Sequence, residues 1–231
     1  MGAQWKHAGR IEQGAARGAI FTRLSKEIIV AAKNGDPNPE SNARLRAAVE
    51  NARKNSMPRD TIERALKKGR GEVDADVQYH VVTYEGFCPH QVPIIVECLT
   101  ENKNRTAGDV RLLFRKGQLG GTGAVAWLFD RRGLIEATHP KGMDAEEAAI
   151  EAGAQEVKVG EESVEFICDP PDLDAVSKAL QAMGWNVTSG ELGYVAKNLV
   201  ELDDAKKAEV SAFVDGFDDN DDVHRIYVAL A

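Results

Sequence analysis

The sequence has few of the features that mark membrane, secreted or disulfide-bonded proteins. Only three of its 231 residues are cysteines, and no run approaches the ~18 consecutive apolar residues of a membrane-spanning helix. The first six residues lack the apolar stretch of a signal peptide. We therefore expect a cytoplasmic protein with no membrane partner.

The cysteines and histidines do not form the patterns of a metal site or of a reactive thiol. Cys88, Cys98 and Cys168 stand far apart and form no CxxC pair, which is typical of reduced thiols with structural or incidental roles. The five histidines form no HxxxH or HExxH motif, and His90 together with Cys88 would supply only two ligands. We predict no metal site and no cofactor.

Two segments partly match the sequence patterns of ligand-binding loops. The glycine-rich residues 117–123 lack the Lys-Ser/Thr pair of a phosphate loop and precede a predicted strand, whereas phosphate loops open a helix, so we predict a tight turn. Their GxxG pattern also occurs in KH domains, where it joins two helices. The acidic residues 215–222 miss the ligand positions of an EF-hand loop, which predicts a solvated turn between a helix and a strand. No G-x-S-x-G nucleophile motif occurs, and we expect a protein that is not an enzyme.

Positive charge is concentrated in the first third of the chain. Residues 1–71 contain 15 Lys and Arg against 7 Asp and Glu, although the whole chain has 29 basic and 37 acidic residues and a net charge of −8. A split of this size between segments points to a polyanionic partner for the positive part. Nucleic acid is the leading candidate.

The same segment has the apolar periodicity of helices. The inward positions are Ile20, Phe21, Leu24, Ile28, Ile29 and Ala32, then Leu45, Ala48, Val49 and Ala52, and finally Ile62, Ala65 and Leu66. Their spacing predicts one helix that ends near residue 34, a second over residues 41–55, and a third that follows Pro58 and stops at Gly69. Short amphipathic helices bury their stripes against one another, so we expect a three-helix bundle.

Most basic residues of this segment flank the apolar stripes. A face that only promotes solubility mixes charges, whereas this one is two-to-one positive, which favours binding to nucleic acid or to the ribosome. A smaller basic cluster contains Arg105, Arg111, Arg115 and Lys116. The candidate nucleic-acid contacts are Lys6, Arg10, Arg17, Arg23, Lys26, Arg44, Arg46, Arg53, Lys54, Arg59, Arg64, Lys67, Lys68, Arg70, Arg105 and Arg111.

Beyond residue 72 the apolar period becomes that of strands. Residues 77–84 and 92–99 predict a hairpin, which a helix and a strand at residues 124–129 follow. Residues 134–189 show the order β-α-β-β-α-β of a ferredoxin-like unit. A final helix (208–217) and a final strand (225–230) follow. Because a single strand needs partner strands, we expect it to join the first sheet.

The predicted fold class is therefore α+β with three domains. Residues 1–75 are expected to form a basic helical nucleic-acid-binding domain. Residues 76–131 plus 203–231 are expected to form a mixed α+β middle domain, and residues 132–202 an inserted ferredoxin-like domain.

Several motifs, taken in order, resemble the YebC/PmpR family over nearly the full length. They are residues 57–65 (MPRDTIERA), Tyr84-Glu85-Gly86, residues 96–100 (VECLT), Asn104-Arg105-Thr106 and residues 123–129 (GAVAWLF). The resemblance implies the same three domains and a cytoplasmic DNA-binding transcriptional regulator. It also implies relatives, among them a mitochondrial translational activator, that act on the ribosome and ease the synthesis of proline-rich stretches.

The chain departs from this family pattern in three places. The family's opening GHSKW is Gly2-Ala3-Gln4-Trp5-Lys6 here. The family's GPGG after the Tyr-Glu-Gly motif is Cys88-Pro89-His90-Gln91, so we expect a stiffer hairpin. The turn before Gly123 is shorter than the family's.

Two main functions stay open on this evidence. One is a DNA-binding transcriptional regulator, and the other is a ribosome-associated translation factor whose basic residues bind rRNA. DNA and rRNA present the same phosphate charge, so the sequence does not separate them. A hydrolase with its active site in the cleft between the domains is a third alternative.

Overall fold

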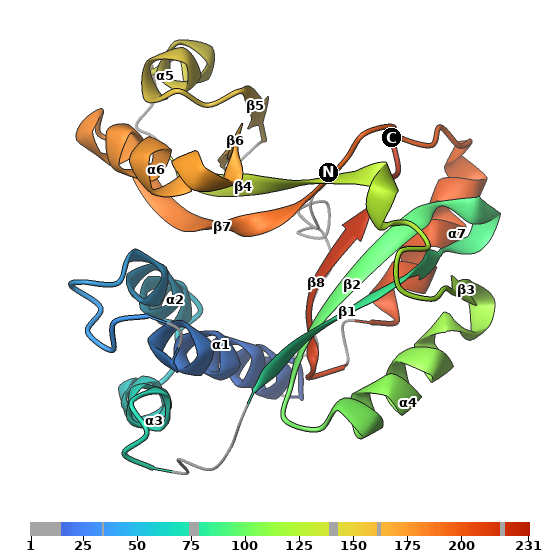
Figure 1. The fold of residues 1–231 in the computed structure, drawn as a ribbon, viewed down its shortest axis with the longest axis horizontal. Coiled ribbons are helices and arrows are strands. Elements are labelled where there is room, and N and C mark those ends of the chain that lie inside the picture. Colours follow the sequence, from blue (N-terminus) through green and yellow to red (C-terminus); the bar gives the residue numbers. More distant parts are fainter. Residues whose placement is uncertain (1–14, 34, 74–78, 139–142, 161–162, 218–219) are drawn as a thin grey trace. The chain divides into compact units, whose positions relative to one another are not determined.

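The computed structural model describes residues 15–33, 35–73, 79–138, 143–160, 163–217 and 220–231. These residues form two compact units, whose elements are labelled in Figure 1. One unit contains the described residues of Met1–Lys26, Asp74–Asp130 and Val195–Ala231, and the other contains those of Glu27–Val73 and Arg131–Tyr194. The three-domain division by residue number stays a prediction.

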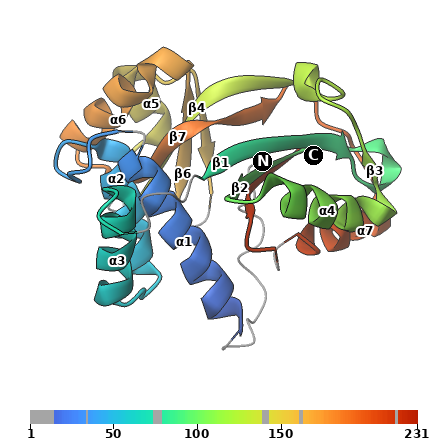
Figure 2. The same ribbon diagram turned by 60° about the horizontal axis from the view of Figure 1, so that its bottom comes forward.

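The first third of the described chain forms three helices, as the periodicity predicts. They are α1 (Ala15–Lys33), α2 (Ala43–Lys54) and α3 (Arg59–Gly69), which Figure 2 shows from below. Asn42 caps α2 because its side chain accepts a hydrogen bond from the Leu45 N–H at 3.0 Å. A Cβ added at Gly69 would lie 2.5 Å from the Cβ of Ala32. The close packing of α3 against α1 therefore requires glycine at this position.

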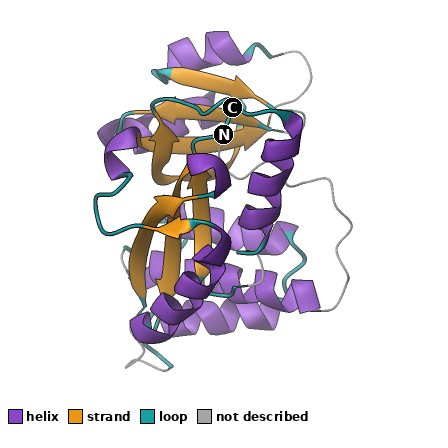
Figure 3. Cartoon of the chain, turned by 90° about the vertical axis from the view of Figure 1, so that its right-hand side faces the viewer, coloured by secondary structure: helices purple, strands orange, loops and turns teal. Residues whose placement is uncertain are grey.

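The first sheet is antiparallel and has the strand order β3-β1-β2-β8. Its strands are β1 (His80–Phe87), β2 (Pro93–Thr100), β3 (Gln118–Leu119) and β8 (Val223–Val228), drawn in orange in Figure 3. Ile95 of β2 stands opposite Tyr227 of β8. The last strand of the chain thus joins the first sheet, which confirms the prediction.

Helices α4 (Lys103–Leu113) and α7 (Asp204–Asp215) pack on this sheet and form its core. The rings of Phe114, Phe213 and Phe217 meet edge to face with centroids 5.4 to 5.7 Å apart. Aromatic pairs at this separation and angle add to the free energy gained by burial. They fix the end of α4 against α7.

The strand predicted at residues 124–129 is wrong. Ala126–Leu128 forms a short 3-10 turn, η4, and the next strand begins only at Phe129. The N–H groups of Val125 and Ala126 donate to the Glu85 carboxylate at 2.8 and 2.7 Å. Because these donors are engaged by a side chain, they do not enter a β ladder.

The second sheet has the order β5-β6-β4-β7. Its elements in chain order are β4 (Phe129–Thr138), α5 (Ala145–Ala152), β5 (Glu156–Val159), β6 (Val164–Cys168), α6 (Leu173–Ala182) and β7 (Asn186–Ala196). Both helices contribute to one core with the sheet, in which Phe166 and Trp185 meet at a centroid distance of 5.0 Å. This arrangement is the predicted ferredoxin-like topology, although β7 extends beyond its predicted end near residue 189.

Candidate functional site

Helices α2 and α3 expose most of their basic side chains. Leu45, Val49 and Ala52 of α2 are buried, and at about 100° per residue Arg46 and Arg53 fall on one flank of that stripe while Lys54 points away from it. On α3, Ile62 and Ala65 are buried and Arg64 and Lys67 are exposed. The two helices therefore present their cations to solvent.

The cations on these helices outnumber the carboxylates of the same helices. Four basic residues and one acidic residue lie in α2, and four basic and two acidic residues lie in α3. Of the acidic residues, Glu63 is engaged by Arg59 at 2.9 Å. An exposed pair of this kind adds little to stability, so the excess of positive charge remains at the surface.

Some cations of this segment serve the local structure. Arg46 donates to the carbonyl oxygens of Pro39 and Glu40 at 3.1 and 2.7 Å and so closes the turn between α1 and α2. Arg70 lies 3.9 Å from the Glu72 carboxylate. In contrast, Arg53, Lys54, Arg64 and Lys67 make no hydrogen bond or ion pair with any other described side chain.

Lys26 does not belong to this exposed surface. Its ammonium group is buried and lies 2.5 Å from the Asp222 carboxylate, and it also donates to the Asp221 carbonyl oxygen at 2.9 Å. A cation that is already enclosed and neutralised in this way has no free contact to offer a phosphate. The prediction that Lys26 contacts nucleic acid is therefore not supported.

Asp222 is the centre of a buried polar cluster. Its carboxylate also accepts hydrogen bonds from Arg105 at 2.9 Å and from the Thr106 hydroxyl at 2.8 Å. Burial alone would raise its pKa, but the bonds from Lys26, Arg105 and Thr106 outweigh burial and lower the pKa to about 2. The prediction that residues 215–222 form a wholly solvated turn is thus wrong at its last residue.

The remaining candidate residues are distributed as follows. Lys6 and Arg10 lie outside the described residues, and Arg17 lies in α1 but its side chain is outside the described part. Arg23 is partly buried on α1, Lys68 is half-buried on α3, and Arg44 and Arg59 are exposed. Arg111 is exposed on α4, and Arg105 is half-exposed beside Asp222.

The glycine-rich loop does bind an anion, but that anion is the protein's own carboxylate. Glu85 of β1 is buried and accepts N–H bonds from Gly123, Val125 and Ala126 at 2.7 to 2.8 Å. Burial raises its pKa, and the three backbone donors more than offset this and lower the pKa overall. Because these donors are occupied, the loop is not a phosphate site. Apart from the place of Glu85 in the Tyr-Glu-Gly motif, no sequence pattern indicates this role.

The loop between β1 and β2 is strained. His90 and Gln91 have φ angles of 63° and 59°, in the left-handed region that favours glycine. The His90 ring lies 2.9 Å from the Glu209 carboxylate of α7, a contact that holds the loop in place. The expected stiffness of this hairpin thus has a physical basis in two non-glycine residues with positive φ.

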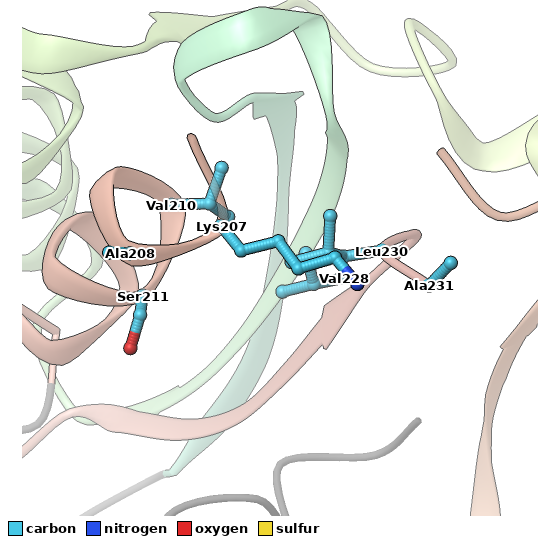
Figure 4. A pocket seen from close by; sticks show the side chains of 7 residues that line it. All are labelled: Lys207, Ala208, Val210, Ser211, Val228, Leu230 and Ala231. Atoms are coloured by element: carbon cyan, nitrogen blue, oxygen red, sulfur yellow. The ribbon is translucent and has the colours of Figure 1, made fainter. Parts of the chain in front are cut away.

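A pocket of about 380 Å³ lies between α7 and the end of the chain (Figure 4). Its lining is Lys207, Ala208, Val210, Ser211, Val228, Leu230 and Ala231. Ser211 has no histidine among these lining residues, and the walls are mainly apolar. The pocket therefore lacks the paired groups that nucleophilic or acid–base catalysis requires.

The three cysteines are free and buried. Burial raises the pKa of Cys88 and Cys98 to about 12 and that of Cys168 to about 11. A thiol that stays protonated is a poor nucleophile and a poor metal ligand. The structural or incidental role predicted for these residues agrees with their surroundings.

The fold and these sites define an α+β protein with an electropositive helical surface. Within the described ranges no three His, Cys, Asp or Glu side chains are grouped closely enough to hold a metal ion, and none of the described helices is long and apolar enough to cross a membrane.

Comparison with known proteins identifies the family. Residues 3–72 match the TACO1/YebC protein N-terminal domain, and residues 79–230 match the TACO1/YebC second and third domain. The chain therefore belongs to the TACO1/YebC family, which is non-enzymatic. This confirms the family suggested by the sequence motifs.

Individual relatives are similar over the full length. A "Probable transcriptional regulatory protein" from Bdellovibrio bacteriovorus is 50% identical over 232 residues, covering 100% of both chains. Another protein with this description, from Pseudomonas fluorescens, is 54% identical over 235 residues with the same coverage. The crystal structure of a conserved hypothetical protein from Aquifex aeolicus is 38% identical and superposes with a TM-score of 0.87, covering 99% of this chain and 96% of that one.

Proposed function

We propose that this protein is a nucleic-acid-binding regulator that acts on transcription by binding DNA through the exposed face of α2 and α3. The observation that carries the proposal is the group Arg53, Lys54, Arg64 and Lys67, which is exposed and has no ion pair within the described chain. A phosphodiester backbone supplies the repeated negative charge that such a surface attracts. The names of the bacterial relatives support the assignment to transcription.

The contacts are expected to be mainly with phosphate. Phosphate contacts fix the position of a protein on a duplex, whereas contacts with base edges specify sequence. The sequence has no helix-turn-helix signature, so we expect modest sequence specificity. Lys6, Arg10, Arg17, Arg23, Arg44, Arg46, Arg59, Lys68 and Arg70 stay predicted contacts, of which Arg46 and Arg70 also bind groups of the protein itself.

A salt titration tests this function. A labelled duplex is titrated with the protein at increasing salt, and the dissociation constant is measured by fluorescence anisotropy. If about five phosphates are neutralised, the logarithm of the affinity should fall against the logarithm of salt with a slope of about −4.5. Absence of binding, or a flat salt dependence, would contradict the proposal.

Binding to the ribosome is the second candidate, since the same cations fit rRNA phosphate and the matched family includes TACO1 in its name. In this role the protein would ease the synthesis of proline-rich stretches. Cosedimentation with ribosomes in the presence of competing DNA separates the two: retention that excess duplex does not displace favours the ribosome, and complete displacement favours DNA.

The proposed site of action is the cytoplasm. The three free, buried thiols fit a reducing compartment, and both candidate partners are found there. No small-molecule cofactor is part of the proposal.

A further inference from the structure

Helix α4 and the 3-10 turn η3 (Phe114–Lys116) that continues it carry a second group of cations, on the unit that contains the first sheet and not on the unit of α2 and α3. The basic residues are Lys103, Arg105, Arg111, Arg115 and Lys116, and all five are exposed. Only one acidic residue, Asp109, lies in the same stretch. This ratio differs from the mixed charge of an ordinary solvated helix face.

These cations lie on the outward side of the helix. Thr106, Val110 and Phe114 are buried in the core beneath, whereas Arg105, Arg111, Arg115 and Lys116 are exposed. Gly108 lies on this outward side, and a Cβ placed there would meet no atom within 4 Å. Glycine at the middle of a basic face allows a ligand backbone to approach the helix closely.

The helix is held rigidly at both ends. At its start, the Asn102 side chain accepts a hydrogen bond from the Arg105 N–H at 3.1 Å, and the Arg105 guanidinium binds Asp222. At its end, the Phe114 ring packs against Phe213 and Phe217. The backbone that carries the cations is therefore ordered before binding, and binding does not have to order it.

The cations of this face have different roles. Arg105 is shared between Asp222 and solvent, so it mainly positions the helix. Arg111, Arg115 and Lys116 make no hydrogen bond or ion pair with the described residues. Their charges are therefore free to meet an anion from outside the protein.

We propose that the outward face of α4 and η3 is a second phosphate-binding surface, which takes the phosphodiester backbone of the same nucleic acid that α2 and α3 bind. The inference rests on the proposed function and extends it from one surface to two. A nucleic acid that reaches both surfaces at once would be bound bivalently, and each contact would then raise the effective concentration at the other surface. Long nucleic acids should then bind more tightly than oligonucleotides too short to reach both.

The test compares two charge reversals of equal size in the same unit. The variant R111E/R115E changes the proposed surface. The control is K206E/K207E on α7, where the two lysines stand among the acidic residues Asp203, Asp204 and Glu209. Affinity for duplex DNA and for an rRNA fragment is measured across salt. We expect R111E/R115E to bind ~10-fold more weakly with a slope smaller by ~1.8, which corresponds to two lost phosphate contacts. The control should change affinity by less than ~3-fold at an unchanged slope.

The outcomes separate this inference from the function on which it rests. If the wild-type protein binds neither nucleic acid, the proposed function itself fails. If the wild type binds with a steep slope but R111E/R115E behaves like the control, the second surface is refuted and the first stands. If R111E/R115E keeps its affinity for nucleic acid but loses retention on polyglutamate, the face binds an acidic protein, and the second phosphate-binding surface is refuted. A loss with DNA alone, or with rRNA alone, supports the surface and identifies its source of phosphate.

A second, milder variant tests the proposal even if R111E/R115E does not fold. Arg115→Gln removes one charge without adding a carboxylate, and it should reduce the slope by ~0.9. Thermal unfolding followed by circular dichroism confirms that each variant is folded. A folded Arg115→Gln protein with the wild-type slope would count against the proposal.

Discussion

Helices α2 and α3 use their charged residues in the opposite way to the unit that contains the first sheet. On the helices, Arg53, Lys54 and Lys67 are exposed and unpaired among the described residues. In the unit of the first sheet, Asp222 and Glu85 are buried, and protein donors match each carboxylate. The difference shows that a count of charges along a sequence does not assign their roles. Burial decides whether a charged side chain stabilises the fold or is available to bind a partner.

Removing Asp222 should give the largest effect. Asp222→Ala leaves the Lys26 ammonium buried without its carboxylate, and breaking a buried pair in this way costs about 3–5 kcal/mol of unfolding free energy. Denaturant unfolding measures the loss, with Asp221→Asn at the exposed neighbour as the control. A loss below ~1 kcal/mol is in the range of exposed ion pairs. It would contradict the claim that the Asp222 cluster stabilises the fold more than a surface pair does.

The same cluster predicts a dependence on pH. Because the pKa of Asp222 is lowered from 3.8 to about 2, the folded state binds this proton less readily than the unfolded state. Its contribution to stability is complete above pH 3.8 and is lost as the pH falls through about 2. Acid titration of wild type and Asp222→Asn should differ in this window, and parallel curves would contradict the assignment.

Glu85→Gln should have the next largest effect. The amide replaces one acceptor oxygen by a donor and removes the charge, so the N–H groups of residues 123–126 lose part of their hydrogen bonding. We expect a loss of about 1–3 kcal/mol and faster amide hydrogen exchange in this loop. Glu101→Gln, at an exposed position, is the control. Unchanged exchange would show that the carboxylate does not hold the loop.

The smallest effect is expected in the strained hairpin. Gln91→Gly relieves a positive φ of 59°, and we expect a gain of about 0.5–1 kcal/mol, since the left-handed conformation costs a non-glycine residue more than glycine loses in chain entropy. His90→Gly should gain less because it also removes the contact with Glu209. Thermal unfolding compares them, and equal gains would argue against a stabilising role for that contact.

Local patterns predicted much of this fold. Apolar spacing located the three helices and the ferredoxin-like order, because each depends on residues that are near in sequence. It failed where a distant side chain intervenes: Glu85 engages the backbone 40 residues later and prevents the predicted strand. Local patterns also place Lys26 on the basic surface, because its buried partner Asp222 lies 196 residues away in the sequence.

The most direct test of the difference between the two regions is a matched pair of triple charge reversals. R53E/K54E/K67E alters the helical surface, and K178E/K206E/K207E makes the same change in net charge elsewhere. We expect the first variant to lose ~30-fold or more in affinity for duplex DNA or rRNA and ~2.7 in salt slope, while the second keeps the wild-type slope. Equal losses in both variants would mean that net charge alone governs binding, and no loss in either would mean that the helices do not bind a phosphodiester backbone.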